Sequence, residues 1–154
     1  MKFPEVEATS LAHKKFHLPA DLEGEINLVV VAFKQWHQNL VDTWIPSLQT
    51  LAVQHRQLRV YELPTMPRFN PFVRFMIDSG MRGGIPDRRV RASTLCIYTN
   101  LDRFTNAIEI PDLETIHLFL LDRSGEVLWR ATGGFDQNRL NELTAEIDRV
   151  AAKP

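Results

Sequence analysis

A short apolar segment, Ile26 to Phe33 (INLVVVAF), constrains the fold more than any other part of the sequence. It is rich in valine and too short to span a membrane, so it predicts a central strand buried on both faces. Apolar residues then recur at helical spacing between Leu40 and Leu51, which predicts an amphipathic helix. In open α/β sheets, ligands bind beyond the carboxyl ends of the strands. The turn from Lys34 to Asn39, between this strand and this helix, is therefore the first place to look for a functional site.

The remaining sequence predicts an alternation of strands and helices. Strands are expected at Lys15 to Leu18, Leu58 to Leu63, Thr94 to Tyr98, Ile116 to Leu121 and Glu126 to Ala131, and helices at Phe69 to Met81, Leu101 to Ala107 and Asp136 to Ala152. The helix between the strands at Ile26 and Leu58 predicts that these two strands are parallel. Residues 1–25 are expected to be a lead-in segment with one short strand, and Pro64 to Pro71 a loop. Residues 1–154 are therefore predicted to form a single α/β domain.

Composition and charge exclude several classes of partner. The chain has 154 residues, 44% of them hydrophobic, which is enough for one core without metals or disulfides. Its net charge of −1 gives no general attraction for nucleic acid or anionic lipid. The N-terminus lacks the features of a signal or transit peptide, and no apolar run approaches the length of a membrane span. We therefore expect a soluble protein without a transmembrane segment, in the cytoplasm or peripheral to a membrane.

The order of the predicted elements resembles the thioredoxin-like fold, in particular its peroxiredoxin-like form. That resemblance implies a three-layer α/β/α sandwich with a mixed central sheet. In thioredoxins, the turn after the central strand carries Trp-Cys-x-x-Cys, with one cysteine activated at the helix N-terminus. The corresponding residues here are Trp36-His37-Gln38-Asn39-Leu40, and Ile116 holds the position of the family's cis-proline. Because thiol–disulfide exchange needs an attacking thiolate, the resemblance implies that this turn has lost its redox chemistry.

A narrower resemblance is to the mitochondrial ATP synthase assembly factor family called ATPase complex subunit ten. Two separated motifs carry it: Phe33-Lys34-Gln35 with Gln38-Asn39-Leu40-Val41-Asp42-Thr43-Trp44 and Pro46, then Leu120-Leu121-Asp122-Arg123 with Gly125, Leu128-Trp129-Arg130 and Gly133. The resemblance implies a peroxiredoxin-derived fold without redox cysteines. It also implies a protein that assists the assembly of a membrane-embedded ATP synthase subunit. A mitochondrial location would follow only if a presequence had been removed.

Five residues form the candidate ligand or partner site at the end of the central strand: Trp36, His37, Gln38, Asn39 and His117. A helix N-terminus disfavours the cation of His37, so this residue is expected to be a neutral donor to a ligand or a surface residue in a vestigial turn. The fold analogy brings His37 close to His117. Two histidines could begin a site for a metal or small-ligand carrier, but no third ligand is evident, so neither a metal site nor a cofactor is predicted.

An enzyme is the other alternative. A peroxiredoxin-like or other thioredoxin-fold enzyme would have to use Cys96, the single cysteine, or His37. Cys96 lies within an apolar predicted strand, where burial raises the pKa of a thiol, so it is expected to be an inert core residue. No catalytic residue is therefore predicted.

Charge is concentrated in one segment. From Arg68 to Arg91 there are six arginines and two aspartates, a local net charge of +4. Such a run is usually a solvated face, but arginines beside a Gly-Gly turn could also bind a carboxylate or a phosphate. The candidate patch for an anionic partner consists of Arg74, Arg82, Arg88, Arg89 and Arg91. The favoured hypothesis is a redox-inactive thioredoxin-like protein that binds a protein partner, membrane-associated in the ATP synthase case, and the oligomeric state is left open.

Overall fold

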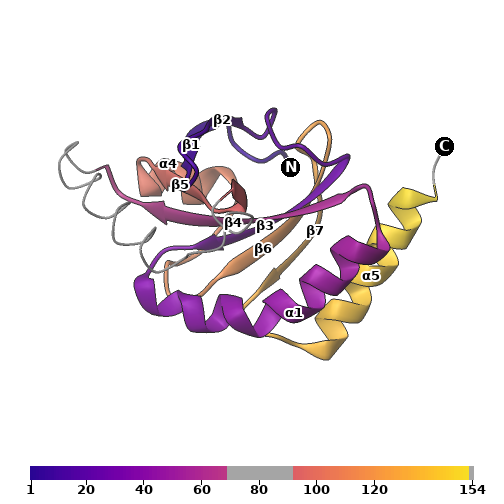
Figure 1. Cartoon of the computed structure of the whole chain (residues 1–154). Coiled ribbons are helices and arrows are strands. Elements are labelled where there is room, and N and C mark those ends of the chain that lie inside the picture. Colours follow the sequence, from indigo (N-terminus) through magenta and orange to yellow (C-terminus); the bar gives the residue numbers. More distant parts are fainter. Residues whose placement is uncertain (69–91, 153–154) are drawn as a thin grey trace.

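The computed structural model describes residues 1–68 and 92–152 of the chain. These residues form a seven-stranded sheet in the order β2-β1-β5-β4-β3-β6-β7 (Figure 1). The elements are β1 (Val6–Ser10), β2 (Lys15–Leu18), β3 (Ile26–Ala32), the 3-10 helix η1 (Gln35–His37), α1 (Gln38–Gln54), β4 (Leu58–Met66), β5 (Leu95–Tyr98), α4 (Leu101–Ala107), β6 (His117–Asp122), β7 (Val127–Thr132) and α5 (Gln137–Ala151).

Strand β3 lies inside the sheet, as its apolar sequence predicts. It pairs in parallel with β4 and antiparallel with β6. Six of its seven residues are buried. Leu28 and Val30 pack into one hydrophobic cluster, whereas Val29 and Val31 pack into the other, on the opposite face. The strand ends at Ala32, one residue before the predicted end, and the sheet is mixed because the last hairpin, β6–β7, runs antiparallel.

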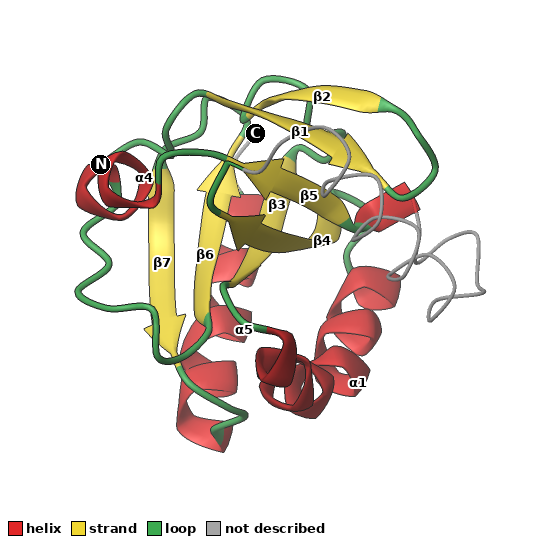
Figure 2. Ribbon diagram, turned by 90° about the vertical axis from the view of Figure 1, so that its left-hand side faces the viewer, coloured by secondary structure: helices red, strands yellow, loops and turns green. Residues whose placement is uncertain are grey.

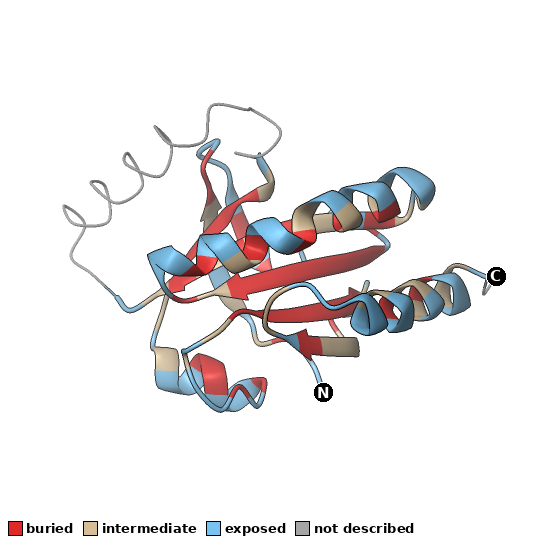
Figure 3. Ribbon diagram, turned by 90° about the horizontal axis from the view of Figure 1, so that it is seen from below, coloured by how far each residue is buried: buried red, intermediate tan, exposed pale blue. Residues whose placement is uncertain are grey.

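Helices cover both faces of the sheet, which confirms the predicted α/β/α sandwich. Helices α1 and α5 lie on one face, and α4 lies on the other (Figure 2). The strands beneath α1 and α5 are buried along most of their length (Figure 3). Helix α1 buries Val41, Trp44, Leu48 and Leu51, which recur every three or four residues. Burial of each such side chain contributes roughly 1.5–3 kcal/mol of hydrophobic stabilisation. This packing on the sheet offsets the cost of Pro46, so the helix continues past that residue.

The ends of the later helices agree with local sequence signals. Helix α4 spans the predicted Leu101–Ala107, and the Asn100 side chain caps it by accepting the backbone N–H of Arg103. Helix α5 begins after Asp136, whose carboxylate accepts the backbone N–H of Arg139 at 3.1 Å. An acceptor at this position satisfies one of the free N–H groups of the first turn. The predicted start of this helix at Asp136 agrees with the structure to within one residue.

Two parts of the sequence-based description are wrong. Val6–Ser10 was expected to belong to the lead-in segment, outside its one predicted strand. It forms β1, which pairs with both β2 and β5 and so lies inside the sheet. Its sequence, VEATS, has little apolar character and no clear strand pattern. The segment is a strand because it is hydrogen-bonded to a neighbouring strand on each side. Strand β4 continues beyond Leu63 through Pro64 to Met66, because Thr65 and Met66 pair with β5 where the pairing with β3 ends. The loop therefore begins after Met66.

Other predictions fall outside the described residues. These are the helix expected from Phe69 to Met81 and the arginine patch of Arg74, Arg82, Arg88, Arg89 and Arg91. Arg68, which precedes them, is exposed. Across residues 1–68 and 92–152, no helix has both the length and the apolar character needed to cross a membrane.

Candidate functional site

The candidate site lies where β3 ends and η1 and α1 begin. Because β6 runs antiparallel to β3, its first residue lies beside the end of β3, and His117 pairs with Val31. The structure therefore brings His117 to the same edge of the sheet as the turn that contains His37. The five candidate residues divide into two groups. Trp36, Gln38 and Asn39 are exposed, whereas His37 and His117 are buried.

His37 holds the turn from within. Its side chain is 0% exposed, and its Nδ1 atom accepts the backbone N–H groups of Phe33 at 3.0 Å and Lys34 at 3.2 Å. An imidazole nitrogen that accepts hydrogen bonds carries no proton, so the neutral ring has its proton on Nε2. The expectation of a surface histidine is wrong, because the two amides between β3 and η1 need a buried acceptor and this ring supplies it.

Three buried ring nitrogens have no hydrogen-bond partner among the described residues: Nε2 of His37 and both nitrogens of His117. A buried polar atom without a partner costs about 1–3 kcal/mol, so such atoms are rare. Burial lowers the pKa of both histidines, because the charged ring would lose its hydration. Both rings are therefore neutral at pH 7.

Nearby charges modify this effect of burial. The backbone carbonyl of Glu114 and its carboxylate favour the cation of His37 and oppose the lowering of its pKa, whereas the Lys34 ammonium adds to it. Lys34 and Glu114 form an ion pair at 2.8 Å above the turn. The backbone carbonyl and carboxylate of Asp112 oppose the lowering of the His117 pKa, whereas the Arg130 guanidinium and His37 add to it. The two rings are thus close enough for the charge on one to disfavour the charge on the other.

The two histidines do not belong to a metal-ligand set within the described part of the chain. No group of three or more His, Cys, Asp or Glu side chains in those residues could hold a metal ion. Nδ1 of His37 is already occupied by two backbone amides. The residues present therefore do not fit a structural or catalytic metal centre, both of which use at least three protein ligands.

Cys96 lies in a different part of the sheet. It is 2% exposed, sits in β5 opposite Thr9 of β1, and β4 separates its strand from β3. The prediction that this thiol is buried in the core is confirmed. A peroxidatic thiolate needs exposure and a nearby positive charge or helix N-terminus. Cys96 lies within β5, five residues before the first residue of α4, and its burial denies it the exposure that such a thiolate needs.

The exposed residues around the start of α1 include two large apolar side chains. Trp36 is 52% exposed, and its ring packs edge-on against the ring of His37, with centroids 4.5 Å apart. Phe135, 38% exposed, follows β7, and its backbone N–H donates to Thr43 Oγ1 of α1 at 2.9 Å. We call Trp36, Gln38 and Asn39 the contact surface. Phe135, which the sequence analysis did not single out, lies further along α1, where its ring packs against Trp44.

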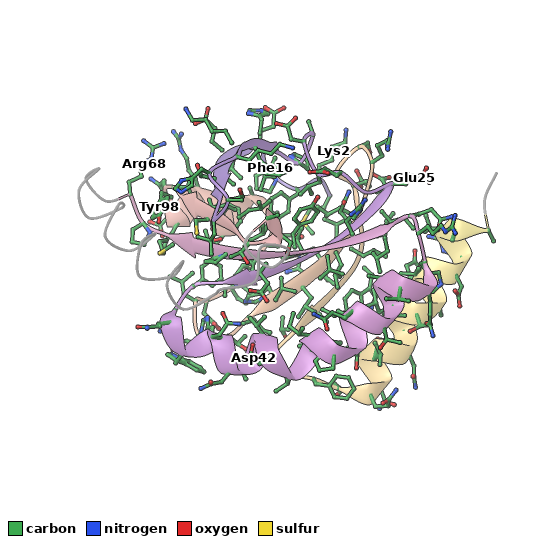
Figure 4. The ribbon with its side chains drawn as sticks, in the orientation of Figure 1. Lys2, Phe16, Glu25, Asp42, Arg68 and Tyr98 are labelled. Atoms are coloured by element: carbon green, nitrogen blue, oxygen red, sulfur yellow. The ribbon has the colours of Figure 1, made fainter. Side chains whose placement is uncertain are left out.

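The surface recesses lie elsewhere. One of about 640 Å³ is lined by residues of β1 and β2 together with Arg68 and Tyr98, which Figure 4 shows near one another at one end of the sheet. Another of about 350 Å³ is lined by the turn at Gly24 and by Arg56, Arg59 and Arg123. Neither recess is lined by any of the five candidate residues. Within the described residues, the candidate site therefore presents Trp36, Gln38 and Asn39 on the surface, with His37 and His117 buried.

Solved structures show the same fold at low sequence identity. The alignment with yeast Sco1 with copper bound has 14% identity and a TM-score of 0.60, and covers 99% of this chain and 94% of that chain. BsSco, a member of the Sco family of cytochrome c oxidase assembly proteins, gives 10% identity, a TM-score of 0.64 and coverage of 99% and 95%. A putative thiol:disulfide interchange protein DsbE from Chlorobium tepidum gives 13%, 0.58, and coverage of 98% and 96%. At these identities the likeness shows a thioredoxin-like fold alone.

Sequence comparison shows the family. No curated protein sequence matches the chain. The sequence model of the family described as ATP10 protein matches residues 1–150, which is nearly the whole chain and includes both motifs on which the narrower resemblance rests. The chain belongs to the ATP10 protein family of ATP synthase assembly factors.

Proposed function

We propose that this protein is a redox-inactive assembly factor that binds a membrane-embedded ATP synthase subunit through the contact surface. Family membership supports the ATP synthase part of the proposal. The observation that carries the binding part is the half-exposed Trp36 at the end of the central strand. The thioredoxin-like fold usually presents chemistry at this edge of the sheet, and here it presents an aromatic ring.

The chemistry of the site favours binding over catalysis. The turn from Phe33 to Leu40 contains no sulfur, and Cys96 is buried in β5. The histidine within the turn uses its accepting nitrogen to hold two backbone amides, so it has no free basic nitrogen to offer a substrate. A general base must reach the proton that it removes. The exposed groups that remain, an indole and two side-chain amides, are suited to contact with another protein.

The size of the expected contribution follows from the exposed area. A tryptophan buries about 150–250 Å² when fully covered, and Trp36 has about half of its surface still exposed. Covering the rest at about 25 cal/mol per Å² contributes on the order of 2–3 kcal/mol, the range of an interface hot spot. Loss of the ring should therefore weaken binding by about one to two orders of magnitude.

Capture of the detergent-solubilised membrane sector of ATP synthase by the immobilised protein tests the proposal. Trp36→Ala is expected to reduce capture of the membrane subunits at least about tenfold relative to wild type. Val53→Ala is the matched control, because Val53 is an 85% exposed apolar residue near the other end of α1. Cys96→Ala should bind as wild type does, because no thiol takes part. Equal capture by Trp36→Ala and wild type, or an equal loss in Val53→Ala, would disprove binding through the contact surface.

A further inference from the structure

We propose that neutral His37 is the positioning residue of the contact surface: it holds Trp36 outward, and its protonation releases the turn, so that mild acid frees the partner. The last step rests on the proposed function. The earlier steps concern only the turn and can be tested without a partner. Nothing in the family membership or in the structures compared above assigns this role to His37.

The hydrogen bonds of His37 allow only one protonation state. Nδ1 accepts the N–H groups of both Phe33 and Lys34, and the backbone N–H of His37 itself donates to the carbonyl of Lys34 at 3.0 Å. A second proton on the ring would have to sit on Nδ1, where two N–H donors already point at it. Protonation therefore breaks both bonds and places three donors against one another.

The surroundings of the ring compensate the cation only in part. The backbone carbonyl of Glu114 favours it, but within the described residues neither Nε2 of His37 nor any nitrogen of His117 on β6 makes a hydrogen bond of good geometry. The charged or titratable groups that face His37 are Lys34 from its own turn, Glu114 from the segment before β6, and His117. His117 is in turn faced by Asp112 and Arg130. The Glu114 carboxylate, which favours the cation, is already paired with the Lys34 ammonium, which disfavours it.

His37 is expected to take up a proton only when its ring leaves this buried site. A charge that its surroundings do not fully compensate is far more costly inside a protein than in water, so the protonated ring is stable only when the turn opens and exposes it. Trp36 must move with this opening, because its ring rests edge-on against His37 and both belong to the three-residue helix η1. The same event removes the support of Trp36 and changes the outline of the contact surface.

The first readout is the NMR signal of the Trp36 indole N–H, assigned by its absence in Trp36→Phe and followed from about pH 7.5 to about pH 5. In wild type, acid should move this signal toward its position in His37→Ala. In His37→Asn it should stay, because an asparagine oxygen can accept at the δ position and does not titrate. His13→Asn is the matched control: His13 is exposed and has a positive φ of 66° that asparagine accepts, so it should follow wild type.

The Trp44 indole separates local opening from global unfolding. It is buried and donates to the carbonyl of Gly133 at 2.9 Å, so its signal should persist in all variants across this range. Equal movement of the Trp36 signal in wild type and His37→Asn would overturn the proposal, as would a wild-type signal that does not move. A Trp44 signal lost together with that of Trp36 would also overturn it, because the event would then be unfolding of the whole domain.

Capture of the solubilised ATP synthase membrane sector supplies the second readout. Wild type should lose capture about tenfold per pH unit once His37 protonates, whereas His37→Asn should change less than about twofold. The two proposals fail differently. If the Trp36 signal moves as expected but neither protein captures the membrane sector at any pH, the proposed function is wrong and the positioning of Trp36 by His37 stands. If His37→Asn loses capture in acid as wild type does, the role of His37 is wrong and the proposed function stands.

Discussion

Glu62 is a carboxylic acid held in a poorly hydrated place. It lies on β4, on the face that α1 covers. Burial and, to a smaller extent, the Asp42 carboxylate of α1 (Figure 4) together raise its pKa from 4.5 to about 7. The folded protein therefore binds more protons than the unfolded chain between these two values, so stability falls as pH rises from about 4.5 to about 7. At higher pH the buried charge remains a destabilising feature.

Glu62→Gln should remove this effect. At about pH 8 the variant is expected to be more stable than wild type by up to about 3 kcal/mol, and near pH 4.5 the two should be similar. Asp42→Asn should give a smaller gain in the same direction, because it removes only the secondary repulsion. Urea unfolding at the two pH values measures both differences. A Glu62→Gln variant no more stable than wild type at about pH 8 would show that the carboxylate is well hydrated.

For single residues, the sequence predicts an interaction well when the partners are close together in the chain. Asp122 directly follows the predicted strand Ile116 to Leu121, and its carboxylate accepts from the backbone N–H groups of Ser124 and Glu126. All partners lie within four residues, so the sequence is sufficient. The burial of His37 could not be predicted in the same way, because the cover comes from β6 and the segment before it, which are about eighty residues away in the chain. Only the neutral state of the His37 ring was predictable from the sequence.

At the scale of elements, two glycines with the same backbone conformation are in different surroundings. Gly125 in the β6–β7 turn has a φ of +87°, and Gly133 after β7 has a φ of +85°. A Cβ atom on Gly125 would lie 2.5 Å from Cγ of Pro19, whereas on Gly133 the nearest side-chain atom would be Thr115 Oγ1 at 3.9 Å. The hairpin turn is thus packed directly against the end of β2, and Gly125 also accepts the N–H of Phe3.

Alanine at each position separates conformational strain from packing. Gly133→Ala should lose about 1 kcal/mol of stability, the typical cost of a left-handed conformation for a non-glycine residue. Gly125→Ala should lose more stability than Gly133→Ala. The additional loss should be roughly 1–3 kcal/mol, because Pro19 and the N-terminal segment must also move. The midpoints of urea unfolding give the comparison. Equal losses would mean that the contact between the hairpin turn and Pro19 adjusts freely.

Elements with strong periodicity were predictable, and those that depend on their neighbours were not. β3, α4 and α5 have clear apolar patterns or caps, and their predicted bounds agree with the structure to within about two residues. β1 has only Val6 and Ala8 as apolar residues, and becomes a strand because β2 and β5 pair with it from both sides. Pro64 reads as a loop residue, yet it closes the pairing of β4 with β3 opposite Ala32.

For the whole molecule, the layers and the mixed sheet were predicted from the resemblance of the order of elements to the thioredoxin-like fold. That order places His117 beside the turn at His37, because only an antiparallel β6 starts at the edge where β3 ends. The order could not show which side chains at that edge are covered. Exposure depends on details such as the Lys34–Glu114 ion pair and the docking of Phe135 on Thr43, which join segments far apart in the sequence.

The acid stability of the whole domain should reflect two opposing effects. His37 and His117 have lowered pKa values in the folded state, so the unfolded chain binds more protons below about pH 6.5 and stability falls as pH falls. Glu62 has the opposite effect between about pH 4.5 and about pH 7. Each group changes the slope of unfolding free energy against pH by at most about 1.4 kcal/mol per pH unit. In wild type the effect of the Glu62 carboxyl therefore partly cancels the effect of the two histidines.

Single variants should separate the two effects. Glu62→Gln should lose stability more steeply than wild type between about pH 6.5 and about pH 5, because the opposing term is gone. His117→Phe should lose stability less steeply, and should be more stable at every pH, because it removes two unpartnered nitrogens while keeping a ring beside Phe33. Urea unfolding at half-unit steps of pH measures the slopes. Parallel curves for wild type and both variants would mean that neither the buried carboxyl nor the buried imidazole is linked to folding, because linkage requires a pKa difference between the folded and unfolded chain.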